Sequence, residues 1–256
     1  MNNKKNSQPF TAITFFNLNS RNKMWALAKM RNGGNQLNEQ KGNLFSKLMG
    51  SGRGAGFSII PNFNVYSMLT VFKSEQHFID FTNSEFWQNY NSRSHESFTV
   101  ILSPIEVKGT WNNLQPFGTK NDPVNELRAV ITRASIKKSK LVQFWKQVPA
   151  TSKAIEKAKG KLFSIGIGEL PLIEQATFSM WENSKAIRDY AYRNKAHKKA
   201  VTDTHKIQWY SEEMFARFNP IATIGTFNGK KPLEDYGIIS FEDVPSQAEL
   251  LSLTRV

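Results

Sequence analysis

The chain has 256 residues, of which 39% are hydrophobic and 12% aromatic, and it carries a formal net charge of +13. It contains no cysteine, which excludes disulfides, a thiolate nucleophile, cysteine-ligated zinc or iron–sulfur clusters and a thiolate-ligated haem. No apolar run reaches the roughly 20 residues that span a bilayer, and the polar start lacks the apolar stretch of a signal peptide. We therefore expect a cytoplasmic protein.

The first half of the sequence predicts the element order β-α-β-β-α-β. We expect a strand at residues 12–18, a helix at 21–31, an Asn- and Gly-rich loop at 32–43, strands at 57–60 and 65–72, a helix at 74–90 with Ser74 as its N-cap, and a strand at 98–102. This order is the split βαβ motif of the ferredoxin-like fold.

The second half predicts the same order after a linker at residues 116–123. We expect a strand at 129–132, a helix at 140–158, strands at 162–167 and 173–181, a helix at 183–202, a helix at 210–218 and a strand at 221–227. The last of these helices places Glu212 and Glu213 at its start, where acidic side chains suit the helix dipole.

The two halves share sequence as well as pattern. The segment PIEVKGTW at 104–111 returns as PIATIGTF at 220–227. Upstream of this pair, Phe72-Lys73-Ser74 in the first half is matched by Trp181-Glu182-Asn183 in the second. We therefore expect an α+β protein made of two tandem ferredoxin-like units, at residues 1–118 and 119–230, followed by a tail at 231–256. Two such units in one chain can pack as an intramolecular dimeric α-β barrel.

The net positive charge indicates an anionic partner. The Lys and Arg clusters at 137–140, 153–161 and 193–199 are short and lie on amphipathic segments, so we expect no nucleic acid partner. The same basic surface can make a peripheral contact with anionic lipid on the inner face of a membrane.

Several residues could carry chemistry. Arg53 lies in the glycine-rich segment 48–57, where it either offers a cation to a carboxylate such as a haem propionate or belongs to a mobile loop. Arg133 ends an apolar strand, and it either points into a cavity or extends to the rim. Glu169 is the acid that we expect as a cavity group. His197 shares a helix face with Ile187 and Tyr190, as a core histidine or as a ligand.

Five segments together resemble the spheroidene monooxygenase family of carotenoid 2-oxygenases. They are LMGSGRGAGF at 48–57, TRASI at 132–136, GIGE at 166–169, QATFSMW at 175–181 and WYSEEMFARF at 209–218. The similarity spans roughly residues 12–232, and it is the combination of segments that is specific.

The resemblance implies a haem b enzyme that uses O2 and electrons from a ferredoxin-type donor to oxygenate C-2 of an acyclic carotenoid. Two hydroxylations at that carbon followed by loss of water would leave a ketone. The family pattern Tyr-x(6)-His falls on Tyr190 and His197, which makes His197 the expected iron ligand, with His205 as the alternative. Arg133 would then steer O–O cleavage.

Two other functions are consistent with the sequence. One is a haem barrel with peroxidase or aldoxime-dehydratase-like activity on a small molecule. The other is a carrier that binds haem or a carotenoid without changing it. The carotenoid and the carbon that is attacked also stay open at this point.

Overall fold

The computed structural model describes residues 8–193, 207–246 and 248–250. The first half contains β1 (Phe10–Leu18), α1 (Lys23–Asn38), β2 (Asn43–Gly52), β3 (Pro61–Phe72), α2 (Glu75–Thr82), α3 (Glu85–Asn91) and β4 (Ser94–Gly109). The second half contains β5 (Arg128–Ile136), α4 (Leu141–Trp145), α5 (Val148–Glu156), β6 (Lys161–Leu170), β7 (Glu174–Trp181), α6 (Ser184–Arg188), a π-helical turn (Asp189–Arg193), β8 (Tyr210–Gly225) and β9 (Ile239–Phe241). Short 3-10 turns lie at Ser20–Asn22, Lys138–Lys140 and Glu234–Tyr236.

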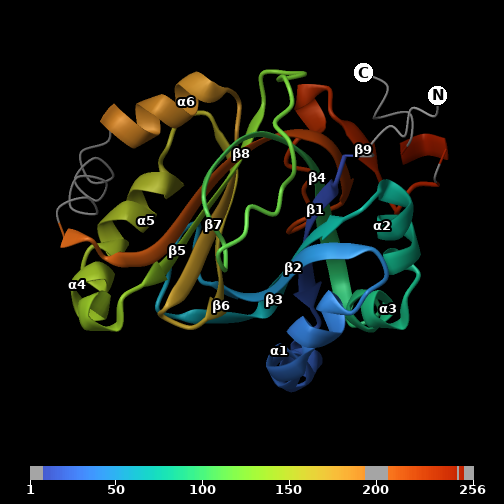
Figure 1. Cartoon of the computed structure of the whole chain (residues 1–256), viewed down its shortest axis with the longest axis horizontal. Helices are drawn as coiled ribbons and strands as arrows, with labels where there is room; N and C mark the ends of the chain where they lie inside the picture. Colours follow the sequence, from blue (N-terminus) through green and yellow to red (C-terminus); the bar gives the residue numbers. More distant parts are fainter. Residues whose placement is uncertain (1–7, 194–206, 247, 251–256) are drawn as a thin grey trace.

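The strands form one closed barrel (Figure 1). Their order is β4-β1-β3-β2-β6-β7-β5-β8-β9, and an additional pairing of β4 with β8 closes the ring. Each half therefore contributes four strands in equivalent positions, while β9 adds to the outside of β8 in parallel. The predicted α+β fold, with two ferredoxin-like units in an intramolecular dimeric α-β barrel, is confirmed.

The two junctions between the halves differ in length. The β4–β8 junction is a long antiparallel ladder that extends from Phe98 opposite Gly225 to Gly109 opposite Met214. The β2–β6 junction consists of Gly50 opposite Gly168 and Ser51 opposite Ile167. Residue 118 lies between β4 and β5. The exact boundaries predicted for the two units and the tail stay predictions.

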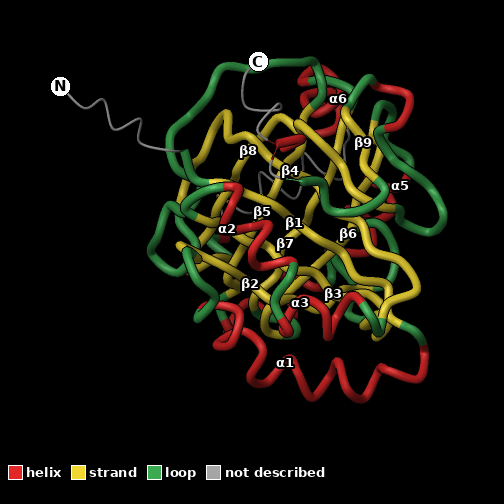
Figure 2. The backbone as a smooth tube through the Cα atoms, turned by 90° about the vertical axis from the view of Figure 1, so that its right-hand side faces the viewer, coloured by secondary structure: helices red, strands yellow, loops and turns green. Residues whose placement is uncertain are grey.

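Helices cover the outside of the barrel on two opposite sides. The helices α1, α2 and α3 lie against the first four strands, and α4, α5 and α6 lie against the second four (Figure 1). Figure 2 shows the strands wrapped between α1 on one side and α6 on the other. No helix of the described ranges is both long and apolar enough to cross a membrane.

The apolar core is divided by the barrel wall. One cluster fills the interior with side chains from both halves, among them Phe15, Phe98, Phe178 and Phe218. A second, continuous cluster lies between the first unit's strands and its helices. The second unit instead has two separate small clusters on its outer face, around Phe144 and around Trp181. Among the described residues, the apolar packing under the second unit's helices is thus divided in two.

The tail is more ordered than its weak pattern predicts. Strand β9 pairs with Ala222 to Ile224 of β8, and Leu233 packs inside the barrel. Phe241, Val244 and Leu250 pack on the first unit's outer cluster. The described part of the tail therefore helps to cover the first unit.

Two predicted elements are wrong in type. The strand predicted at 57–60 is a loop, because β2 already ends at Gly52. The helix α1 extends to Asn38, through residues that the sequence predicts as a loop. The helix predicted at 210–218 is part of the strand β8. Met214, Ala216 and Phe218 alternate into the barrel interior, and β8 pairs on both sides, with β4 and β5. Tertiary pairing overrides the helix propensity of this segment.

Three predicted helices are shorter than expected. The helix at 74–90 is divided into α2 and α3, and the helix at 140–158 into α4 and α5. Ser74 precedes α2, but its hydroxyl hydrogen-bonds Nδ1 of His77 (2.7 Å) and caps no backbone N–H. The helix predicted at 183–202 begins as α6 and turns into a π-helix at Asp189, and residues 194–202 lie outside the described ranges.

Candidate functional site

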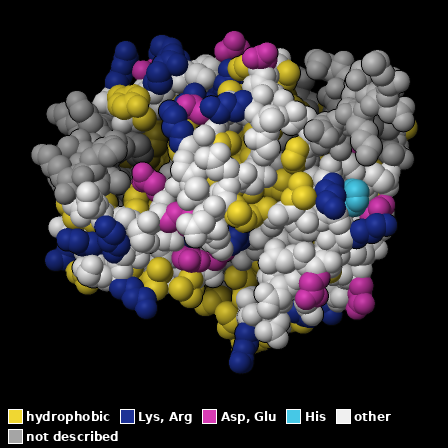
Figure 3. Space-filling model, in the orientation of Figure 1, with side chains coloured by type: hydrophobic (Ala, Val, Ile, Leu, Met, Phe, Trp, Pro, Cys, Tyr) yellow, Lys and Arg dark blue, Asp and Glu magenta, His cyan; other side chains and the backbone are white. Residues whose placement is uncertain are grey.

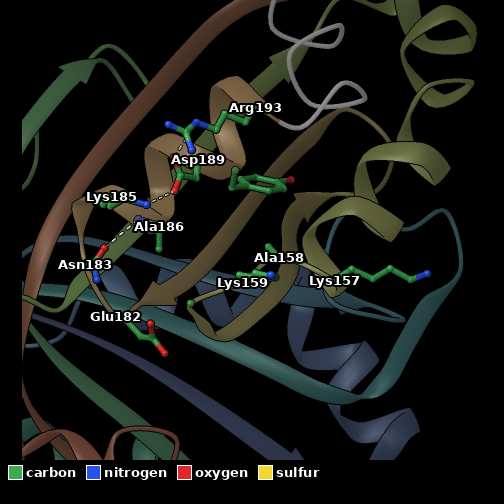
Figure 4. A pocket seen from close by; sticks show the side chains of 11 residues that line it. Lys157, Ala158, Lys159, Glu182, Asn183, Lys185, Ala186, Asp189 and Arg193 are labelled. Carbon is green, nitrogen blue, oxygen red and sulfur yellow. Dashed lines mark hydrogen bonds and ion pairs between the residues drawn. The ribbon is translucent and has the colours of Figure 1, made fainter.

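A cavity of 470 Å³ lies on the outer face of the second unit (Figure 4). Its wall is formed by the turn from α5 into β6, by the end of β7, and by α6 with the π-helical turn that follows it. Asn183 positions α6, because its side chain accepts a hydrogen bond from the backbone N–H of Ala186 (2.9 Å). A π-helical turn at such a position is typical of functional sites.

Charged side chains surround this cavity. Lys157, Lys159, Lys185 and Arg193 supply positive charge, and Glu182 and Asp189 supply negative charge. Asp189 holds two of the cations, Lys185 through Oδ2 (2.7 Å) and Arg193 through Oδ1 (3.2 Å). These hydrogen-bonded and charged contacts lower the pKa of Asp189. Figure 4 shows Lys157 directed away from the other labelled side chains, and Lys159 carries no ion pair within the described ranges.

Tyr190 forms the apolar side of the cavity. Its ring lies 5.2 Å from the ring of Trp181, and both belong to the small cluster that includes Val130, Ile155 and Ile187. Burial raises the pKa of Tyr190 well above its ordinary value, so its hydroxyl stays protonated at neutral pH. The cavity thus has an apolar wall opposite a mixed, mainly cationic rim.

The glycine-rich loop of the first unit reaches this region of the second. Its Phe57 carbonyl accepts a hydrogen bond from the Ser152 hydroxyl of α5 (2.7 Å), and Ala55 packs on the cluster that contains Tyr190. A Cβ on Gly166 of β6 would lie 2.1 Å from the carbonyl oxygen of Gly56. Glycine is therefore required there so that the two backbones can pass. Arg53, in the same loop, is exposed.

The same loop borders a second cavity of 380 Å³, near one end of the barrel. Gly54 and Ala55 line it together with Val65, Ile165 and Phe227, and no charged side chain contributes to its lining. Two buried polar atoms close to it, Oδ1 of Asn64 and Oγ of Ser164, have no hydrogen-bond partner. The glycine-rich loop therefore lines this cavity and packs on the cluster beside the outer one.

Arg133 and Glu169 lie elsewhere, at one end of the barrel interior. Arg133 is 1% exposed and forms ion pairs with Glu212 and, at 3.6 Å, with Glu174. Glu169 accepts hydrogen bonds from Nζ of Lys47 (2.5 Å) and from Nε1 of Trp111 (2.7 Å). The guanidinium of Arg133 lies 5.7 Å from the centre of the Trp111 ring. One aromatic side chain therefore bridges these two predicted residues.

Comparison with known proteins identifies the family. No family model matches the chain. The spheroidene monooxygenase of Rhodobacter capsulatus is 32% identical over 234 residues, which cover 88% of this chain and 95% of that protein. The chain belongs to the spheroidene monooxygenase family. The spheroidene monooxygenase of Cereibacter sphaeroides is 34% identical over 229 residues, 86% of this chain and 69% of that protein. The chain is therefore an enzyme of the monooxygenase class.

A solved structure has the same fold. An aldoxime dehydratase in complex with butyraldoxime superposes with a TM-score of 0.57, covering 85% of this chain and 81% of that one, at 8% sequence identity. At that identity the likeness supports the duplicated barrel and says nothing of the reaction.

The site residues that the sequence predicts for this chain fall into three groups. Tyr190 lines the outer cavity, and Arg53 lies in the loop that packs beside it. Arg133 and Glu169 lie together inside the barrel and not in that cavity. His197 and His205 lie outside the described residues. The catalytic and cofactor roles assigned to these residues stay predictions.

The described histidines are not placed at the cavity. His77 contacts Ser74 before α2, and the side chain of His95 is 52% exposed. Within residues 8–193, 207–246 and 248–250, no group of three or more His, Asp or Glu side chains could hold a metal ion. A single histidine ligand at the cavity would have to come from residues 194–206, which follow Arg193 directly.

Sequence reasoning missed Lys159 and Asp189 as lining residues. The internal repeat contains a signal for Asp189, since it aligns Asp189 with Asp80. Lys159 has no such signal, because its position at the cavity depends on how α5 turns into β6.

Proposed function

We propose that the chain is a haem-dependent carotenoid monooxygenase that oxygenates an acyclic carotenoid at C-2. The observation that carries this proposal is the sequence identity to spheroidene monooxygenases over nearly the whole chain. The cavity on the second unit supports it by offering a place for the cofactor.

The residues of the cavity fit a haem. Its 470 Å³ falls within the range of about 300–1,000 Å³ that is typical of small-molecule sites. A porphyrin is apolar across its faces and carries two carboxylates at one edge. The Tyr190 ring, supported from behind by Trp181, suits one face, and Lys159 and Arg193 are cations that suit the carboxylates. Arg53 would contribute a further cation if its loop closes over the site.

His197 is the proposed iron ligand. It follows the cavity-lining residue Arg193 by four residues in sequence, and its spacing from Tyr190 matches the family pattern. His205 is the alternative ligand. A bound haem would supply the activation of O2, using two electrons from a ferredoxin-type donor for each oxygen atom inserted.

The chain's own contribution is to bind and to exclude water. The apolar cluster around Trp181 and Ile187 keeps water away from one side of the cavity. The cationic rim would hold the cofactor's carboxylates and so fix its orientation. Each insertion consumes one O2, two electrons and two protons, and it yields a hydroxyl group and one water. A second insertion at the same carbon gives a gem-diol, which loses water to leave a ketone.

The test is the absorption spectrum of the purified protein with added haem, as isolated and after dithionite and carbon monoxide. We expect a Soret band of histidine-ligated haem that is lost in His197→Ala and kept in His95→Ala, whose side chain is exposed. The loaded protein should then convert an acyclic carotenoid, in the presence of a ferredoxin and its reductase, to a product heavier by one oxygen atom.

Three results would contradict the proposal. If no haem binds, the cofactor assignment is wrong. If haem binds and the carotenoid is returned unchanged, the carrier function is favoured. Turnover of an aldoxime or of peroxide in place of the carotenoid would favour the small-molecule alternative, for which the solved structure supplies only a shared fold.

A further inference from the structure

Exposed apolar side chains gather around α4, on the edge of the second unit. They come from three segments that are far apart in sequence: Val142 of α4, Leu170 and Leu172 at the β6–β7 turn, and Ile59 and Ile60 in the β2–β3 loop. Val142 is 73% exposed, Ile60 56% and Leu172 41%. We call these five residues and the lysines beside them the α4 surface.

Two contacts fix these segments to α4. The indole N–H of Trp145 donates a hydrogen bond to the carbonyl oxygen of Leu172 (3.0 Å), which attaches the β6–β7 turn. The ring of Phe57 packs on that of Phe144 with the centroids 5.9 Å apart, which attaches the β2–β3 loop. The apolar side chains are therefore presented from an anchored scaffold.

Leu172 is unusual at its position. Its φ of 67° is in the left-handed region, which favours glycine or asparagine and strains a leucine. Its side chain is also partly exposed, so packing offsets that strain only in part. The turn therefore presents a large apolar side chain at the surface, at a position where glycine or asparagine would be favoured.

The charge of the α4 surface has a single sign. Residues 137–153 carry five lysines and no acidic residue. Lys138, Lys146 and Lys153 are exposed, and none of them forms an ion pair within the described residues. Figure 3 shows Lys and Arg side chains next to hydrophobic ones along the lower left edge of the molecule, where α4 lies in Figure 1.

We propose that the α4 surface docks the protein on an anionic phospholipid bilayer. Exposed apolar side chains can enter the region of the lipid headgroups and acyl chains, and lysines beside them are attracted to anionic lipid. Neither element alone holds a protein firmly, so the combination matters. The inference rests on the composition of this surface and does not depend on the proposed reaction or cofactor.

The absence of cysteine makes a direct test available, because a single introduced cysteine takes one environment-sensitive fluorophore. The variants are Val142→Cys, Ile60→Cys and Leu172→Cys, with Met24→Cys on α1 as the control, since Met24 is 76% exposed and lies outside the α4 surface. Vesicles are made of phosphatidylcholine, with or without phosphatidylserine. We expect blue-shifted emission for the three labels on the α4 surface with the anionic vesicles, and no shift at Met24→Cys.

Binding strength is measured by co-sedimentation of the full chain with the same vesicles. The triple variant K138Q/K146Q/K153Q should bind at least about tenfold more weakly, since three cations that are attracted to anionic lipid are lost. The matched control R31Q/K41Q/K120Q removes the same charge from exposed positions elsewhere. It should bind within about twofold of the parent protein. Circular dichroism establishes that each variant is folded.

Three outcomes would overturn the proposal. One is equal weakening in both triple variants, which would mean that net charge alone drives binding. A second is a shift at Met24→Cys as large as the others. The third is a response of the α4 labels to a purified ferredoxin and none to vesicles, which would make this surface a protein-docking site.

Discussion

Glu96 and Glu212 perform the same task at opposite ends of the β4–β8 junction. Glu212, near the start of β8, accepts hydrogen bonds from the Thr110 hydroxyl (2.8 Å) and from the backbone N–H groups of Asn112 and Asn113 (3.1 and 2.7 Å). Glu96, near the start of β4, accepts the equivalent bonds from Thr226 (3.0 Å), Asn228 (2.7 Å) and Gly229 (3.0 Å). Each half thus caps the turn that follows the last barrel strand of the other.

The two ends differ in the residue that supports the carboxylate. Asn17 of β1 lies opposite Glu96 in the ladder and donates a hydrogen bond to it (3.0 Å), whereas Glu212 lies opposite Ser135 of β5 and pairs with Arg133, two residues away. A neutral amide supports the first carboxylate and a buried cation supports the second, so the two ends differ electrostatically while the hydrogen bonds to the following turn are repeated.

Removal of one carboxylate should weaken the closure of the barrel. Glu212→Gln leaves the Arg133 guanidinium buried with only the more distant Glu174, so we expect a loss of about 3–5 kcal/mol in the free energy of unfolding. Glu96→Gln has no buried cation to expose and should cost about 1–3 kcal/mol. Glu213→Gln, at an exposed neighbouring position, is the control. Urea unfolding measures all three, and equal losses in the two carboxylate variants would contradict the role of Arg133.

The same carboxylates predict a dependence of stability on pH. Burial raises the pKa of both, but hydrogen bonds from backbone N–H groups and side chains outweigh it, so the pKa of Glu96 and of Glu212 lies below the ordinary value of 4.5. A folded-state pKa below the unfolded one adds stability that is complete above about pH 4.5 and lost as the pH falls through the folded values.

We therefore expect the melting temperature to fall steeply below about pH 4.5 in the parent protein. The fall should be less steep in Glu212→Gln, because that variant has one fewer group to protonate. Thermal denaturation followed by circular dichroism between pH 3 and 7 measures both slopes. An identical pH dependence would mean that other carboxylates govern acid unfolding.

Arg133→Gln separates a structural role from the predicted catalytic one. The variant leaves Glu212 without its cation, and we expect a loss of about 3 kcal/mol or more in stability. Turnover is then compared per folded molecule, at a temperature where both proteins are intact. Unchanged turnover would assign Arg133 to the barrel alone, and a large loss in kcat with unchanged KM would support the catalytic prediction.

The close passage of the glycine-rich loop over β6 is also testable. Gly166→Ala places a methyl group where the carbonyl of Gly56 now lies, so the loop has to move, and we expect a loss of about 2 kcal/mol or more. Gly50→Ala is the control, since a Cβ there meets nothing within 4 Å. Because Ala55 of the loop packs on the cluster that supports Tyr190, Gly166→Ala should also weaken haem binding in a titration, whereas Gly50→Ala should not.

Tyr190→Ala removes the apolar wall of the outer cavity. We expect haem affinity to fall about tenfold or more, because an aromatic contact and its buried area are lost. Tyr190→Phe keeps the ring and should bind nearly as the parent does. Absorption titration with haem measures both, and equal affinity in Tyr190→Ala would place the cofactor elsewhere.

The sequence by itself determined the duplicated architecture. The repeated motifs at 104–111 and 220–227 end β4 and β8, and Gly109 and Gly225 in them have nearly the same positive φ, 76° and 75°. Such features are local: they depend on turn chemistry, on alternating apolar residues and on N-cap positions, which neighbouring residues specify. The similarity of its motifs to one enzyme family was likewise readable from the chain alone.

Only the tertiary structure decided which distant residues meet. Residues 210–218 have the composition of a helix, yet they form a strand because β4 and β5 supply backbone partners on both sides. The sequence leaves open whether Arg133 points into a cavity or extends to the rim, and only the barrel brings Glu212 and Glu174 to it. The cavity beside Tyr190 depends on how the α5–β6 turn, the end of β7 and α6 are placed around one another. Register and packing over such distances are collective properties of the closed barrel, and no local pattern encodes them.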